Sequence, residues 1–172
     1  MAIIFELFIE TLDETETPAM LDFWSGFSTK TTDGTQFNWT VTTHSPRHVV
    51  LWSESLGLSG IQSFTHAKQM TECGISFANR LLESPDFEFA RIGIEVDGYS
   101  RSDFVQEYRD DGEPWVPEGT IISESLWNDI GKPNDLALFR DGYRWCVYRG
   151  ESVNPIQVDP QLYQMWKQLP GC

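Results

Sequence analysis

The sequence predicts an α+β domain in which a mainly antiparallel sheet packs on one long amphipathic helix, with a short C-terminal helix. Residues 60–84 carry apolar side chains at helical spacing. Several short apolar segments precede and follow this stretch, and turn signals rather than helices separate most of them, which favours antiparallel pairing. A chain of 172 residues fits a single compact domain, 1–172.

The helix predicted over 60–84 has one apolar side and one polar side. At about 100° per residue, the apolar side runs from Ile61 to Leu82, and the opposite side includes Gln69 and Glu72. Ser84-Pro85 ends the pattern and no proline interrupts it. At a rise of about 1.5 Å per residue, this helix would be about 36 Å long and would cross a whole sheet.

Three strands are expected before the helix. They cover residues 2–11, a segment around 37–42 in which Phe37, Trp39 and Val41 alternate with polar residues, and residues 48–53. Residues 20–27 fit either a short helix or a packed loop, and the sequence leaves both open.

After the long helix, the chain returns to short elements. Strands are expected over 87–96 and 120–122, with a short helix over 102–108 between them. Ser123 or Ser125 is the expected cap of a brief second helix.

The strongest hairpin signal is Asp141-Gly142, a pair favoured in two-residue turns because both positions tolerate positive φ. The predicted register places Arg140 opposite Tyr143, and Leu138 opposite Trp145. Residues 149–158 are expected to form a tether to the C-terminal helix. That helix starts at Asp159-Pro160, an N-cap followed by proline at the first helical position.

The charge of the chain is strongly acidic. Twelve Lys and Arg residues stand against 26 Asp and Glu residues, giving a net charge of −14. The excess lies in two blocks, 1–54 and 83–135. Such a field repels phosphate backbones, so nucleic-acid binding is not expected, whereas a basic partner would be attracted.

Targeting and membrane signals are also not evident. No apolar run reaches the roughly 18–20 residues that a bilayer crossing needs. The first residues lack the basic region of a signal peptide and fit a strand instead. We therefore expect a soluble, cytoplasmic protein that does not bind membranes.

The function that we expect is non-catalytic binding of another protein with a basic surface. Inhibitors, immunity-type proteins and accessory or assembly factors are domains of this kind. The predicted binding residues are Trp115, which lies between two prolines in an acidic loop, and its acidic neighbours Asp110, Asp111 and Glu113. The alternative is that Trp115 folds back as a plug for the loop.

The hairpin adds two further binding candidates, Arg144 and Tyr148, because basic and aromatic residues alternate along it. In a basic protein this pattern would indicate nucleic-acid binding. Here we expect the arginines to pair with acids of the same chain, or with the acidic block of a second copy in a homodimer.

Two alternative functions are also considered. The first is a small-molecule-binding or hydrolytic enzyme with a cup between sheet and helix, using His44, His48 and Glu54. The second is carbohydrate binding, which would need at least two coplanar exposed tryptophan rings.

A metal site and a cofactor are not expected. His66, Met70 and Cys73 lie on one stripe of the long helix at a spacing that soft metals accept. The same stripe borders the apolar side, where methionine and cysteine are ordinary core residues. The sequence contains no phosphate loop and no dinucleotide fingerprint.

Overall fold

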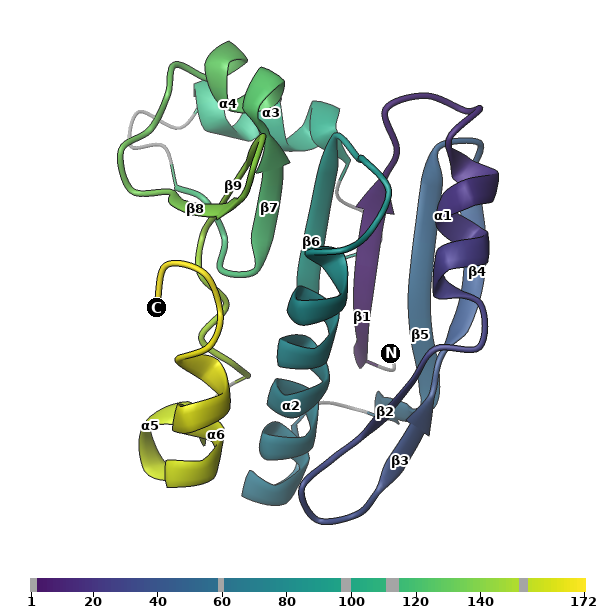
Figure 1. The fold of residues 1–172 in the computed structure, drawn as a ribbon, viewed down its shortest axis with the longest axis vertical. Helices are drawn as coiled ribbons and strands as arrows, with labels where there is room; N and C mark the ends of the chain where they lie inside the picture. Colours follow the sequence, from purple (N-terminus) through teal and green to yellow (C-terminus); the bar gives the residue numbers. More distant parts are fainter. Residues whose placement is uncertain (1–2, 59–60, 97–99, 111–114, 152–154) are drawn as a thin grey trace.

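A seven-stranded antiparallel sheet is the centre of the molecule (Figure 1), which confirms the predicted α+β class. A computed structural model describes residues 3–58, 61–96, 100–110, 115–151 and 155–172. The strands lie side by side in the order β4-β5-β1-β6-β7-β9-β8. Their bounds are β1 Ile3–Glu10, β4 Thr40–Ser45, β5 His48–Leu58, β6 Phe89–Ile94, β7 Thr120–Ser123, β8 Ala137–Arg140 and β9 Tyr143–Trp145. A separate two-stranded sheet pairs β2 (Ser28–Lys30) with β3 (Gln36–Asn38).

The long helix α2 spans Phe64–Leu81, so it is shorter at both ends than the predicted 60–84. Ser63 fixes its start, because the Ser63 hydroxyl accepts a hydrogen bond from the backbone N–H of His66 at 3.1 Å. Ile61 and Leu82 lie just outside the helix and still pack against the core. In Figure 1, α2 lies over the sheet between α1 (Thr17–Trp24) and the C-terminal helix α6 (Pro160–Trp166).

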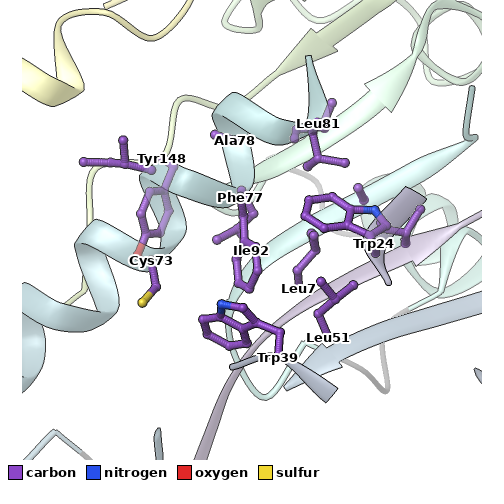
Figure 2. Packing of buried hydrophobic residues seen from close by; sticks show 14 of the residues in the cluster. Leu7, Trp24, Trp39, Leu51, Cys73, Phe77, Ala78, Leu81, Ile92 and Tyr148 are labelled. Atoms are coloured by element: carbon purple, nitrogen blue, oxygen red, sulfur yellow. The ribbon is translucent and has the colours of Figure 1, made fainter. Parts of the chain in front are cut away.

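Aromatic side chains fill the interface between α2 and the sheet (Figure 2). Phe77 of α2 lies 4.4 Å from Trp39, 6.0 Å from Trp24 and 6.2 Å from Phe5, measured between ring centroids. All four rings are buried. Aromatic pairs at such distances contribute about 0.5–1.5 kcal/mol each beyond the area they bury.

The opposite face of the sheet is covered over part of its width by α3 (Arg101–Asp110) and α4 (Glu124–Asp129). A second, smaller core forms there around Phe8, Phe89 and Phe104. The hydroxyl of Ser123 accepts the backbone N–H of Leu126 at 3.1 Å, so Ser123 is the cap of α4.

Two predictions about the strands need correction. The strand expected around 37–42 is divided at Trp39, which lies between β3 and β4 and donates its indole N–H to the Thr29 hydroxyl at 3.0 Å. In the hairpin, Arg140 does face Tyr143. A register shift between Leu138 and Arg140, however, places Leu138 opposite Arg144 instead of Trp145. The open question over residues 20–27 is answered by α1, which covers their first half.

The C-terminal segment packs closely on α2. The Asp159 carboxylate accepts the backbone N–H groups of Gln161 and Leu162, which confirms the predicted cap, and it forms an ion pair with Lys68 of α2 at 2.8 Å. Within the expected tether, α5 (Pro155–Val158) buries Pro155 and Ile156. Of the helices that the structure describes, none combines the length and the apolar character that spanning a bilayer requires.

Candidate binding site

An open cavity of about 400 Å³ lies beside the second half of β6. β6 pairs with β1 as far as Ile94, but its pairing with β7 stops at Arg91. Beyond that point, the segments before β7 and after β9 lie beside β6 and form the other walls of the open cavity. We call it the Trp115 cavity, and its lining consists of Arg91, Ile92, Gly93, Ile94, Val96, Trp115, Pro117, Glu118, Tyr148, Gly150 and Glu151.

Trp115 is the exposed wall of this cavity. Its side chain is 71% exposed, whereas Val116 and Pro117, which follow it, are buried. The ring is therefore mostly exposed and does not plug the loop, although the chain directly after it is buried. An exposed indole is a suitable anchor for a partner.

Tyr148 forms the floor of the cavity and is 2% exposed. Its ring packs against Gly74 of α2 so closely that a Cβ at Gly74 would lie 2.3 Å from Tyr148 Cε1. On a second side, a Cβ at Gly119 would lie 3.2 Å from Tyr148 Cδ2. Figure 2 shows Tyr148 beside Cys73 of α2. Two glycines thus make room for this ring, and their close approach fixes its position.

Glu151 is the most perturbed acid of the cavity. The pKa of its carboxyl is raised from 4.5 to about 7. Burial is the main cause and the neighbouring Glu118 adds to it, whereas Tyr148 and Arg91 lower the pKa and oppose the shift. The Tyr148 hydroxyl donates to Glu151 Oε1 at 2.9 Å, and the Glu151 backbone N–H donates to the Thr71 hydroxyl at 3.0 Å. At neutral pH this carboxyl is therefore about half protonated.

This pKa shift has a direct consequence for stability. The folded protein keeps the Glu151 proton at a pH where an unfolded chain, with a pKa of 4.5, has lost it. The contribution of Glu151 to stability is therefore most favourable below pH 4.5, decreases as the pH rises from about 4.5 to 7, and stays low above that range.

The charges around the cavity are mixed, with two acids and two bases. The lining contributes the carboxyls of Glu118 and Glu151 and the guanidinium of Arg91. Arg149 lies at the rim, 4.0 Å from Glu118 and largely exposed. A pair this exposed contributes little to stability, so Glu118 remains accessible to another cation.

Of the four predicted binding residues that the structure describes, it brings two together. Trp115 and Tyr148 line the same cavity, Tyr148 as its floor rather than as a surface contact. Arg144 lies elsewhere, with its guanidinium stacked 4.8 Å above the ring of Trp127. Asp110 is exposed at the end of α3. The other two predicted acids, Asp111 and Glu113, fall outside the described residues.

The structure does not bring together the three residues named for the histidine cup, His44, His48 and Glu54. His48 packs edge-on against Phe8, and its Nε2 lies 3.8 Å from Glu10 Oε2, beyond hydrogen-bonding distance. Glu54 is exposed six residues further along the same strand, about 20 Å away at the rise of an extended chain. His44 is exposed on β4.

The stripe of His66, Met70 and Cys73 is part of the protein interior. All three side chains are buried, and burial lowers the pKa of His66 and raises that of Cys73. Neither ring nitrogen of His66 has a hydrogen-bond partner among the residues described. Within that part of the chain, no group of three or more His, Cys, Asp or Glu residues is placed to hold a metal ion.

All seven tryptophans lie in the described part of the chain, and Trp115 is the one among them that is mostly exposed. The coplanar exposed pair that carbohydrate binding would need is therefore not present there. No protein-family model, curated protein or solved structure that we compared with this chain matches it.

Sequence reasoning missed Arg91, Glu118 and Glu151 as members of a site. These residues are far apart in the chain and belong to no local motif: Arg91 lies within β6, Glu118 precedes β7 and Glu151 follows β9. Gly119 and Gly150, beside two of them, were the one available signal, because both adopt positive φ where the chain turns away from the sheet.

Proposed function

We propose that this protein is a non-catalytic, acidic binding domain whose partner is a protein with a basic surface. Inhibitors, immunity-type proteins and accessory or assembly factors belong to this class. The observation that carries the proposal is the exposed indole of Trp115 on its buried base of Val116 and Pro117. The net charge of −14 adds long-range attraction for a basic surface.

Trp115 supplies the affinity in this proposal. A tryptophan that becomes fully buried at an interface removes about 150–250 Å² of surface from water. Truncating a tryptophan anchor of this kind to alanine typically reduces the binding free energy by about 2 kcal/mol or more. We therefore expect Trp115→Ala to weaken partner binding about 30-fold or more, because 1.4 kcal/mol corresponds to a factor of ten.

In this proposal, the acidic blocks increase the rate of association with the partner. Because exposed charges are screened over about 10 Å at 0.1 M salt, binding should weaken markedly between 50 and 500 mM salt. Exposed acids near the Trp115 cavity, such as Glu118, should contribute most to this dependence.

The test starts from a pull-down with the whole protein at 50 mM salt, followed by identification and purification of the captured partner. Dissociation constants are then measured for the wild type, Trp115→Ala and Leu138→Ala. Leu138 is a matched control because it is an exposed apolar side chain, 54% exposed, on the opposite face of the sheet from α2. Loss of affinity in Trp115→Ala but not in Leu138→Ala supports the proposal.

The charge requirement is tested with two triple variants. One neutralises Asp110, Asp111 and Glu113, and the control neutralises three exposed acids far from the cavity in sequence: Asp13, Glu14 and Glu16. We expect the first variant to lower the association rate more than the second. Binding that is insensitive to salt and to both triple substitutions would refute an electrostatic partner.

The two alternative functions have less support. A catalytic cup would need His48 and Glu54 to meet, and they lie six residues apart on the same long strand. Carbohydrate binding would rest on Trp115 alone.

A further inference from the structure

We propose that the Trp115 cavity receives a lysine or arginine side chain of the basic partner, held between the Trp115 indole and the carboxyl groups of Glu118 and Glu151. This inference deepens the proposed function and rests on it. It assigns to the cavity a ligand class, an organic cation on a flexible stem.

The shape and the lining of the cavity suit such a side chain. One wall is an exposed tryptophan ring, the aromatic group that attracts cations most strongly. Backbone and apolar side chains of β6, such as Ile92 and Ile94, line another part, where the methylene stem of a lysine or arginine can lie. The cavity, at about 400 Å³ and open to solvent, is large enough for one long side chain.

The carboxyls of the lining can attract a cation when both are ionised, which for Glu151 requires a pH above about 7. Two carboxyls, those of Glu118 and Glu151, face one guanidinium, that of Arg91. The exposed ion pair of Glu118 with Arg149, at 4.0 Å, is loose enough to be exchanged for the partner's cation.

The floor of the cavity is prepared in advance. Tyr148 is confined by Gly74 and Gly119, and its hydroxyl holds one oxygen of Glu151 at 2.9 Å. Binding therefore orders little of the cavity's own structure, which lowers the entropic cost of association.

The carboxyl of Glu151 makes this binding depend on pH. The titratable and charged groups that face it are Tyr148, Glu118 and Arg91, and its pKa in the free protein is about 7. A bound cation favours the carboxylate, so binding releases the Glu151 proton below pH 7. If the pKa in the complex falls to about 6, the affinity rises about fivefold from pH 6 to pH 8.

The experiment uses the full chain and a deca-lysine peptide as the probe. Isothermal titration at 150 mM salt gives the affinity at pH 6 and pH 8 and, in buffers of different ionisation enthalpy, the number of protons released. The variants are Glu151→Gln, Glu118→Gln and Trp115→Ala, with Asp13→Asn as a control that removes one exposed charge elsewhere. Glu151→Gln keeps the shape of the side chain and cannot ionise, so the fold should be retained.

We expect Glu151→Gln to bind about tenfold more weakly than the wild type at pH 8, to come within about twofold of it at pH 6, and to release no proton. Asp13→Asn should change the affinity less than twofold at either pH. If Trp115→Ala weakens binding while Glu151→Gln and Glu118→Gln bind like the wild type, the cavity inference is wrong and the proposed function stands. If Trp115→Ala also binds like the wild type, both fail, and tighter binding of a deca-glutamate peptide would likewise overturn the inference.

Discussion

The substitution Gly74→Ala tests how tightly α2 and the Trp115 cavity are joined. Gly74 lies in the middle of α2, where alanine is normally favoured over glycine by about 1 kcal/mol. The added Cβ would lie 2.3, 2.5 and 2.7 Å from three atoms of the Tyr148 ring, Cε1, Cζ and the hydroxyl oxygen. Contacts this short cannot be tolerated, so the ring or the helix must move.

The ring has little room to move, because Tyr148 is 2% exposed and packs against Gly119 on another side. Overpacking in such a place typically costs about 1–3 kcal/mol, occasionally more. A displaced ring also weakens its hydrogen bond to Glu151, worth about 1 kcal/mol. After the gain in helix propensity is subtracted, we expect Gly74→Ala to lose about 2 kcal/mol of unfolding free energy and about 4–8 °C in Tm.

Urea unfolding followed by tryptophan fluorescence measures this change, and Asn79→Ala on the exposed side of the same helix is the matched control. The control gains helix propensity without a clash, so it should be neutral or slightly more stable. In a Tyr148→Leu background, Gly74→Ala should cost clearly less, since the smaller side chain leaves space. A Gly74→Ala protein as stable as Asn79→Ala would refute the close packing of the ring on α2.

Three further predictions concern titration, a buried acid and the thiols. As the pH rises from 5 to 8, the wild type should lose up to roughly 3 kcal/mol of unfolding free energy relative to Glu151→Gln, which urea titrations at each pH will measure. The buried Glu72 carboxylate accepts hydrogen bonds from both the backbone N–H and the hydroxyl of Thr32. Glu72→Gln should therefore lower the unfolding free energy by about 1–3 kcal/mol and speed hydrogen exchange at the Thr32 amide, and unchanged exchange would contradict this. Brief N-ethylmaleimide treatment followed by mass spectrometry should modify the exposed Cys172 before the buried Cys73, and the opposite order would contradict the fold.

Local signals in the sequence were sufficient for most of the elements. The alternation in β1, the Asp141-Gly142 turn and the Asp159-Pro160 start of α6 depend on neighbouring residues, and each is found where it was predicted. The fold class follows from the same local signals, because hairpins between short strands impose antiparallel order.

Contacts between distant segments explain what the sequence did not reveal. Glu72 lies on the polar side of the helical pattern, yet it is 2% exposed because the connection between β2 and β3, including Thr32, covers it. Trp39 continues the alternation of the strand expected around 37–42, yet the chain leaves one sheet and joins another at this residue. The periodicity of a segment shows which of its residues share a face. It does not show which other segment of the chain will cover the polar face.

The candidate site shows the same division between local and distant causes. From its proline neighbours, Trp115 could be predicted either as an exposed ring or as a plug for the loop. The pKa of Glu151 depends on burial beside Tyr148 and on charges from β6 and the segment before β7. The cavity exists because β7 pairs with β6 only as far as Arg91, and Gly119, with φ of +78°, turns the preceding chain away. The Gly119 carbonyl accepts the Ile92 N–H at 3.1 Å, and beyond this bond the cavity takes the place of a neighbouring strand. A longer β7 would pair with the rest of β6 and close the cavity. The length of β7 therefore decides whether this fold has a cavity beside the second half of β6.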